Sequence, residues 1–591
     1  MKYPSLNEAT IRSHTTAQSF ERGEASYRKG AVVALTQRGN SLIGQVEGSD
    51  VEPYRVTIQF DAGGLTSTHC TCAYNFQGWC KHIVATLLAS CHNPSQIEHR
   101  PSLSELLKPL NRTQLQTLLE TLSTEHPQLV DAIELHLRQT VSSQSMASKQ
   151  TAHRTMVDPK PFRCQVQQII YNAEGDWNDT PALNEISILV DKACDFTNKG
   201  DGDNALVILE AIIDAYGEIW MNLDGSSGES GDFFYELDAA FAEALLSASI
   251  ISVDQLKWQS KLGVWSEGAS EYGIDDAFAR SQAALNQGWD NPLLQAVLKG
   301  ETIDGSELEE PDSIGAMTLV QIRLNILERQ NRDDEYLNLA KATEHWQAYL
   351  TRLIDLGQLE LAMIQAKQHL DSKMTALAVA QALREQGALE QALEIAKAGL
   401  TLPGPGKAQL ALWTSELAEG LGHQNMGLQS RITVFKTAPT LADYLKIQEL
   451  AQASEWPKLK QDLLDSLRNR TVFADEASVA IFLHEGLLKD AINVVDQLSS
   501  FQAELVKQVM KSAMLQHPDW VISNSRRRAE SIMNEGKAKY YQYAVKWLMM
   551  ARMTYQQVGQ QQEWQRYYGE LLQQHARKRK LIKLLQALKQ P

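Results

Sequence analysis

Four residues whose side chains bind transition metals occur close together near the N-terminus of this 591-residue chain. They follow the spacing C-x-C-x7-C-x-H, and three of the six cysteines in the chain belong to this one motif. The four residues are Cys70, Cys72, Cys80 and His82. Thiolate and imidazole are ligands that zinc prefers in proteins, and four of them close a tetrahedral shell. The motif therefore predicts a single zinc site of the Cys3His type.

The spacing of the four ligands has a geometric reason. Residues before Cys70 alternate as in a strand, so the side chains of Cys70 and Cys72 should point to one face. A loop over residues 73–79 turns the chain back, and Cys80 and His82 then begin an apolar run that is typical of a helix. The metal would join the end of a strand to the start of a helix. Because all four positions are filled by protein, we expect the metal to be structural and not catalytic.

Two roles that need no metal stay open for these cysteines. They could be buried thiols or could pair in disulfides. Residues 1–10 lack the apolar segment of a secretory signal, and a reducing compartment disfavours disulfides. Cys91 and His92 follow closely and could act as spare ligands, but they lie beyond the apolar run, so we expect them to be bystanders.

The residues before the motif indicate a small α+β module. A helix is expected over residues 15–30, capped by Thr15 or Thr16 and closed by Gly30. Four short strands should follow, separated by turn residues, at 31–37, 41–47, 54–60 and 65–70. A unit of about 90 residues has a weak core, and a structural zinc ion can contribute on the order of 10 kcal/mol to such a unit.

The motif and its flanks resemble the SWIM zinc finger. The resemblance rests on C-K-H-I-V-A-T-L-L at the motif and on the segments before it, which are similar to prokaryotic SWIM proteins: Ser19–Leu35, Val46–Ser49 and Tyr54–Ile58. The run Tyr540–Leu585 resembles the tail of bacterial SWIM proteins. The resemblance implies a zinc-finger module over residues 1–92 with its core at 66–90. It also implies roles in DNA binding or protein interaction, as in transposases, chromatin-remodelling ATPases and ubiquitin-ligase subunits.

Beyond the finger the sequence predicts helices almost throughout. Residues 101–138 form a helical segment, and residues 139–161 are rich in Ser, Gln and Thr, which predicts a flexible linker. From 162 to 500 a signature recurs in which Gly is followed, five residues later, by a small and then an aliphatic residue. It begins at Gly200, Gly357, Gly387, Gly422 and Gly486.

The spacing of this signature predicts repeats. Gly357, Gly387 and Gly422 are separated by 30 and 35 residues. Glycine can end one helix in a left-handed turn, and the small residue lets the next helix approach. The pattern resembles tetratricopeptide (TPR) repeats with a drifting period. We therefore predict a mostly α fold, in which a small α+β zinc-finger module at the N-terminus is followed by a long TPR-like α-solenoid.

Charge is distributed unevenly along the chain. The net charge is −16. Residues 501–591 carry 16 Lys and Arg against 6 Asp and Glu, whereas residues 101–500 carry 31 against 58. An acidic chain disfavours non-specific duplex binding over its whole surface but leaves room for a local basic site. No stretch approaches the roughly 18 apolar residues of a membrane span, so we expect a cytoplasmic protein without membrane contact.

The region 501–591 combines basic and aromatic residues. Basic residues interleaved with aromatics can bind single-stranded nucleic acid through charge and stacking. The alternative, which helical spacing favours, is that the rings fill the core of a solenoid cap. In the finger loop, aromatics beside a lysine suit a base or a protein surface equally. The candidate contact residues are Tyr74, Phe76, Lys81, Arg577, Lys578, Arg579 and Lys580.

The sequence contains no catalytic motif that we recognise. It lacks a phosphate-binding G-x-x-x-x-G-K-[ST], an H-E-x-x-H and a G-x-S-x-G pattern. We therefore predict a zinc-binding adaptor without enzymatic activity, which engages a protein on its helical repeats and DNA or a protein through its finger. The alternative is a protein that mainly binds DNA or RNA through the finger and the basic C-terminal region. An unrecognised enzyme is the least favoured hypothesis.

Overall fold

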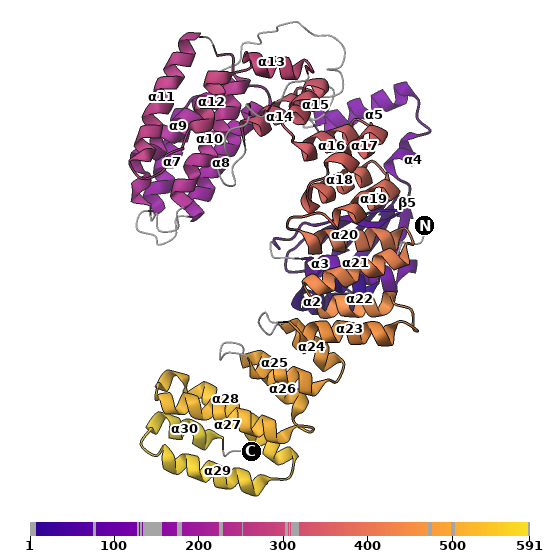
Figure 1. Ribbon diagram of the computed structural model, residues 1–591, viewed down its shortest axis with the longest axis vertical. Coiled ribbons are helices and arrows are strands. Elements are labelled where there is room, and N and C mark those ends of the chain that lie inside the picture. The colour runs from indigo at the N-terminus through magenta and orange to yellow at the C-terminus, as the bar shows by residue number, and fades with distance from the viewer. Residues whose placement is uncertain are drawn as a thin grey trace. The chain divides into compact units, whose positions relative to one another are not determined.

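The computed structural model describes most of the chain and shows a mostly helical protein with one small sheet at the N-terminus (Figure 1). The described residues are 7–74, 78–126, 129–130, 133, 156–173, 180–223, 229–250, 252–301, 305, 308, 318–470, 476–497 and 503–588. This confirms the predicted fold class. Three predicted parts lie wholly or mostly outside the described residues: Phe76, the end of the expected helical segment 101–138 (residues 127–138) and the linker 139–161.

The described chain forms two compact units. Unit 1 combines Met1–Glu105 with Gly404–Pro591, and unit 2 is Leu106–Pro403. Unit 1 thus brings the N-terminal module together with helices more than 300 residues away in sequence. The predicted boundaries of the smaller parts stay predictions, as does the likeness of the helical repeats to TPR repeats.

The N-terminal module (residues 7–100) is a five-stranded sheet with three helices. The strand order is β4-β3-β2-β1-β5, antiparallel except for the parallel pairing of β1 with β5. Four strands match the expected segments, whereas β5 and the short helix α1 were not predicted. The elements are α1 (Glu8–Ser13), α2 (Ala17–Arg28), β1 (Val32–Arg38), β2 (Ser41–Val46), β3 (Tyr54–Asp61), β4 (Gly64–Cys70), α3 (Lys81–His92), the 3-10 turn η1 (Pro94–Gln96) and β5 (Glu98–Arg100).

Helix α3 is the centre of the module core. Every residue from His82 to Ser90 is buried, because α3 packs between the sheet and α2. Two glycines make this close packing feasible. A Cβ on Gly23 of α2 would lie 2.5 Å from the side chain of Val84, and a Cβ on Gly44 of β2 would lie 2.6 Å from that of Thr86. The expected N-cap of α2 is also present, since the Thr16 side chain accepts a hydrogen bond from the amide of Ser19.

The rest of unit 1 is helical. Many consecutive helices pack against each other, most extensively α20 on α21 and α27 on α28. The helices are α20 (Lys407–Gly420), α21 (Gln424–Thr437), α22 (Leu441–Leu450), α23 (Trp456–Arg468), α24 (Glu476–His484), α25 (Leu488–Asp496), α26 (Ala503–Ala513), α27 (Pro518–Glu535), η6 (Ala538–Tyr540), α28 (Tyr541–Gln557), α29 (Gln561–Gln574) and α30 (Arg579–Ala587).

Unit 2 is helical throughout its described residues. It has its own apolar core, in which residues from α7 to α12 pack together. Helix α4 (Leu103–Leu107) spans the boundary between the two units. The helices that follow it in unit 2 are α5 (Arg112–Glu125), α7 (Lys160–Ala173), α8 (Thr180–Asn198), α9 (Gly202–Ile219), η2 (Trp220–Asn222), α10 (Glu229–Ser247), α11 (Ser252–Ser270), α12 (Ala279–Gln287), α13 (Pro292–Leu298), α14 (Leu319–Arg329), α15 (Asp333–Ala342), α16 (Trp346–Asp355), α17 (Leu359–His369), α18 (Lys373–Glu385) and α19 (Leu389–Gly399).

The glycine signature lies where the sequence places it, between paired helices. Gly387 and Gly422 have φ angles of +78° and +83°, a left-handed conformation that L residues disfavour. The small residue of each signature is buried in the next helix: Ala392 in α19 and Gly427 in α21. No helix among the described residues is long and apolar enough to cross a membrane.

Within unit 1 the N-terminal module lies directly against the helices α20–α22 (Figure 1). Helix α1 packs on α22, and the β3–β4 turn meets the end of α20. A Cβ on Gly420 would lie only 2.1 Å from the carbonyl oxygen of Gly63. The two backbones therefore touch at a point where no side chain fits.

We expect Gly420→Ala to destabilise unit 1 by about 1–3 kcal/mol, because the added methyl group forces the module and α20 apart. The matched control is Gly569→Ala in α29, where a Cβ would meet no atom within 4 Å. That change should be neutral or stabilise by up to about 1 kcal/mol through helix propensity. Denaturant unfolding followed by circular dichroism measures both. Equal stability of the two variants would contradict the close contact.

Candidate metal centre

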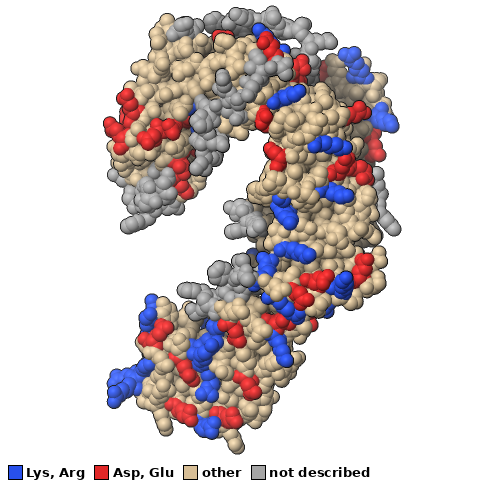
Figure 2. All heavy atoms as spheres, in the orientation of Figure 1, with Lys and Arg blue, Asp and Glu red and all other residues tan. Residues whose placement is uncertain are grey.

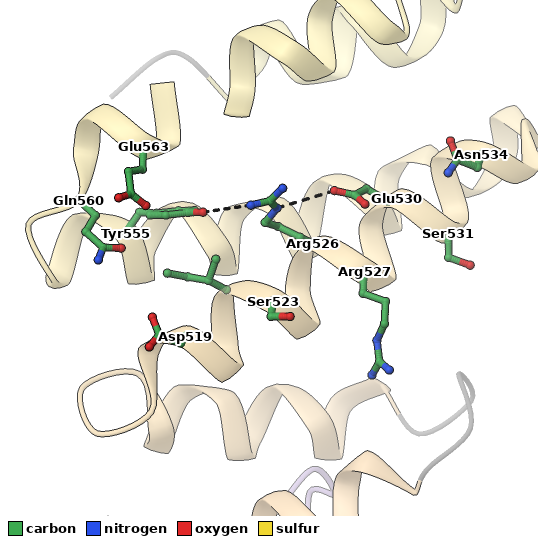
Figure 3. Close-up of a pocket in the computed structure, with 11 residues that line it drawn as sticks. Asp519, Ser523, Arg526, Arg527, Glu530, Ser531, Asn534, Tyr555, Gln560 and Glu563 are labelled. Atoms are coloured by element: carbon green, nitrogen blue, oxygen red, sulfur yellow. Dashed lines mark hydrogen bonds and ion pairs between the residues drawn. The ribbon is translucent and has the colours of Figure 1, made fainter. Parts of the chain in front are cut away.

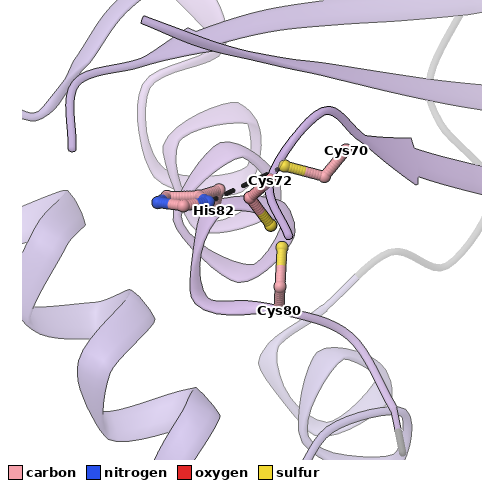
Figure 4. Close-up of side chains that lie close together, drawn as sticks. All are labelled: Cys70, Cys72, Cys80 and His82. Atoms are coloured by element: carbon pink, nitrogen blue, oxygen red, sulfur yellow. Dashed lines mark hydrogen bonds between the residues drawn. The ribbon is translucent and has the colours of Figure 1, made fainter. Parts of the chain in front are cut away.

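The four predicted ligands converge at the junction of β4 and α3 (Figure 4). Cys70 is the last residue of β4, Cys72 follows in a bend, Cys80 is the N-cap of α3 and His82 lies in its first turn. Their ligand atoms all lie within 4.8 Å of one another. Among the residues that the structure describes, this is the one group of His, Cys, Asp and Glu arranged to hold a metal ion.

Backbone contacts set the direction of the cysteine side chains. Thr71 donates its amide to the carbonyl of Arg55, 3.1 Å away, and its hydroxyl accepts the Arg55 amide at 3.0 Å. Thr71 therefore extends the contact with β3 beyond the end of β4, and its neighbours Cys70 and Cys72 lie on the side of α3. Cys80 makes no side-chain cap bond to α3. Its sulfur atom lies among the four donors of the cluster (Figure 4).

The donor set fits a structural zinc ion. With Zn–S bonds of about 2.3 Å, a tetrahedron places neighbouring sulfurs roughly 3.8 Å apart. The four donor atoms lie within 4.8 Å of one another, and Nδ1 of His82 lies 3.7 Å from Sγ of Cys70, so a small closure brings them to zinc-binding distances. Three thiols and one imidazole complete four-coordination without a further ligand. The residues therefore fit zinc held for structural purposes.

Proton affinity in the cluster is uneven. A hydrogen bond from Cys70, aided by one from His82, lowers the pKa of Cys80 to about 4 against the opposing effect of burial. The same interaction with Cys80, together with burial, raises the pKa of Cys70. Burial is the main cause that raises the pKa of Cys72. A divalent cation would replace the protons that the thiols hold when it binds.

An aromatic ring covers His82. His82 is 3% exposed, and the ring of Tyr54 stacks on it with centroids 4.2 Å apart. A Cβ on Gly48 would lie 2.4 Å from the Tyr54 ring and 3.3 Å from Nε2 of His82. Nε2 has no hydrogen-bond partner among the described residues. Because Nδ1 faces the sulfurs and Nε2 faces this packed wall, Nδ1 is the atom available to the metal.

Tyr54 and Gly48 are functional residues that motif reasoning missed. Both fall in segments that carry the family resemblance, Val46–Ser49 and Tyr54–Ile58, but the spacing of the ligands gives no reason to assign them a role. The hydroxyl of Ser49 lies 3.0 Å from that of Tyr54. Only the fold shows that the β2–β3 connection closes one side of the metal centre.

The predicted contact residues of the finger serve different purposes. Tyr74 is half-buried, and its hydroxyl lies 3.2 Å from that of Ser19, so it packs inside the module. Lys81 is half-buried at the first position of α3. Trp79 stacks on His14 with ring centroids 4.4 Å apart. The described part of the loop therefore uses its aromatic rings for packing.

Cys91 and His92 stand apart from the metal cluster. Cys91 is half-buried, and burial raises its pKa. His92 stacks on Tyr27 at 5.6 Å. Neither joins the group of four donors, as expected of bystanders.

The basic C-terminal residues are largely exposed. Arg577, Arg579 and Lys580 are exposed, whereas Lys578 is half-buried and donates to the carbonyl of Met533 at 2.6 Å. In Figure 2, Lys and Arg side chains project from the edge of the C-terminal helices. Five aromatic residues of the region lie in the core: Trp547, Tyr555, Trp564, Tyr567 and Tyr568 are buried, whereas Tyr540 and Tyr543 are exposed.

A cavity of about 680 Å³ runs beside α27 in the same region (Figure 3). Arg526 lies at its centre, stacked 3.8 Å from the ring centroid of Tyr567, with Glu530 3.8 Å from its guanidinium. Arg527 is exposed at the edge of the cavity. The carboxylates of Asp519 and Glu563 also line it. This mixture of charges does not favour a nucleic-acid backbone.

Comparison with known proteins agrees with the metal centre. Residues 54–91 match the SWIM zinc finger family. A stretch of the chain is 35% identical over 151 residues to zinc finger SWIM domain-containing protein 8 of Homo sapiens and of Bos taurus, which is 24% of this chain and 8% and 11% of those proteins. The Drosophila melanogaster homolog is 34% identical over 130 residues, 21% of this chain and 6% of that protein. The N-terminal module carries a SWIM zinc finger.

The similarity covers only a small part of each relative. The chain matches only about a tenth or less of their length. These relatives are eukaryotic, so the predicted prokaryotic type stays a prediction. A solved circular tandem repeat protein aligns with 73% of this chain and 94% of its own at 14% identity. Its TM-score of 0.19 is too low to support any argument about the fold.

We expect Cys72→Ser to lower the zinc content from about one ion per chain toward zero and to unfold the module, because a hydroxyl is a poor replacement for a thiolate. The control is Cys91→Ser, which changes a nearby cysteine outside the cluster and should keep the metal. Elemental analysis and thermal unfolding measure both. Retention of zinc by Cys72→Ser would refute the ligand set.

Tyr54→Ala should speed the loss of zinc to a chelator by about tenfold, because water reaches His82 once the ring is removed and outer-shell contacts hold ligands in place. Tyr54→Phe should restore slow loss. The matched control is Tyr27→Ala, which removes the ring stacked on the non-ligand His92. Equal release rates for Tyr54→Ala and Tyr27→Ala would show that the stacking has no bearing on the metal.

Proposed function

We propose that the protein is a zinc-binding adaptor that mediates interactions between macromolecules and performs no catalysis. The observation that carries this proposal is the closed metal centre: three thiols and one imidazole are all protein groups. A catalytic zinc ion needs a position for water or substrate. The metal therefore stabilises the fold of the SWIM module. The long helical region provides the surface on which a partner can bind.

The helical repeats are the proposed site of a protein partner. Helical repeats expose extended surfaces, and binding to proteins is their common use. Residues 101–500 carry 31 Lys and Arg against 58 Asp and Glu, so a basic partner is favoured electrostatically. We place the protein in the cytoplasm, where its cysteines stay reduced.

A second candidate function is binding of DNA or RNA. It is favoured by the exposed basic residues Arg577, Arg579 and Lys580. The burial of the neighbouring aromatic rings weighs against it, because a ring in the core cannot stack on a base. The finger loop adds little to this candidate, since Tyr74 and Trp79 are occupied by packing.

The adaptor hypothesis predicts no retardation of single- or double-stranded DNA in a gel at about 50 mM salt, where phosphate contacts are strong. It predicts instead that the immobilised full chain captures a protein that excess free chain displaces. Retardation that falls steeply with salt would favour the second candidate. In that case Arg577→Glu with Arg579→Glu should abolish binding, while the charge-matched control Lys407→Glu with Lys436→Glu should retain it. Both control lysines are exposed.

A further inference from the structure

The zinc finger and the helices α20–α22 are joined by a short chain of contacts within unit 1. Trp79, the residue before the ligand Cys80, donates its amide to the carbonyl of His14 at 2.9 Å. The two rings stack nearly parallel, with an interplanar angle of 11°. The Thr15 hydroxyl donates to the Trp79 carbonyl at 2.9 Å. The position of Cys80 at the metal centre therefore fixes the chain between the end of α1 and the start of α2.

His14 continues this path to the helices. Its Nε2 lies 2.6 Å from a carboxylate oxygen of Glu416 in α20. Gly78 has a φ angle of +82°, and a Cβ there would lie 2.9 Å from the carbonyl oxygen of His14. The finger loop and His14 are therefore packed at backbone distance. The path from a metal ligand to α20 needs only Trp79 and His14.

The helical face beneath the module is acidic. Four carboxylates gather there, from Glu416, Glu419, Asp443 and Glu449. They surround two buried cations: Arg431, which is 0% exposed and lies 3.0 Å from Asp443, and Lys446, which lies 2.9 Å from Glu419. Four carboxylates against two cations leave an excess of negative charge on this face.

The module supplies further partners to two of these carboxylates, which also lie near Arg431 and Lys446. His14 pairs with Glu416, and the side-chain amide of Asn7 donates to Glu449 at 2.5 Å. The contact of Gly420 with Gly63 sets the distance between the two surfaces. A donor at each end of the acidic face and a backbone contact between them define a specific docking surface, and burying charges is favourable only where partners are in place.

We propose that the acidic face of α20–α22 is a docking surface occupied by the zinc module of the same chain, and that ligation of zinc holds the module there. Without a metal, no metal–ligand bond joins Cys80 to Cys70 and Cys72, and Trp79 beside His14 is held only by its own hydrogen bonds and ring stacking. Glu416 and Glu449 then lose their partners from the module. Zinc occupancy thus decides whether this face is covered or open to a basic segment. The inference rests on the metal centre and is independent of the adaptor hypothesis.

Hydrogen exchange of the full chain, followed by mass spectrometry with and without a chelator, tests the proposal. Removal of zinc should raise the exchange of α20 and α22 by about tenfold, because their contacts with the module open. Helices α16–α19 of unit 2 are the internal reference and should not change. Unchanged exchange of α20 and α22 after complete zinc removal would overturn the proposal.

A variant separates loss of docking from loss of the folded module. His14→Ala removes the stacking and the contact with Glu416 but touches no ligand, so it should retain one zinc per chain and still raise exchange in α20 and α22 by about five- to tenfold. Arg28→Ala is the control: its side chain is exposed and pairs with Glu24 inside the module. It should match the parent protein. A zinc-loaded His14→Ala with the parent's exchange would exclude the path through Trp79 and His14.

Discussion

The convergence of three sulfurs and one imidazole at the start of α3 is the constraint on which the rest of the module depends. Residues His82 to Ser90 of α3 are all buried. The helix follows the sheet after a loop and is not part of the hydrogen-bonded ladder of the strands. Ligands from β4 and its extension meet ligands from α3 across that loop. A metal ion at this point would join two separate elements into one corner and add stability to a small core.

The same corner extends outward through contacts that involve no metal. Trp79 transmits the position of Cys80 to His14, and His14 meets Glu416. Beneath this contact Arg431 and Lys446 are buried among carboxylates. Buried charges are costly to remove from water and are stable only with partners in fixed places. Their partners all lie in α20–α22, and the module meets this region through His14 at Glu416 and through the backbone contact at Gly420.

In the C-terminal helices most of the large aromatic rings are buried, whereas most of the basic side chains lie on the surface. Trp547, Tyr555 and Trp564 belong to the core, because bulky rings at helical spacing fill the space between antiparallel helices. The basic side chains of the α29–α30 turn are left on the outside. Charged side chains are therefore on the surface at this end of the chain, whereas among its aromatic rings only a few, such as Tyr540 and Tyr543, are exposed.

The sequence by itself determined the metal ligands, the strands β1–β4, the helices α2 and α3 and the glycine-ended helix pairs, because each depends on local spacing: ligand intervals, period-two alternation, caps and turns. It did not reveal β5, α1 or the covering of His82 by Tyr54, and it gave no sign that residues 7–100 dock on helices beyond residue 404. Those features were decided by tertiary structure. Parallel pairing, ring stacking and buried ion pairs join residues distant in sequence, so no local pattern records them.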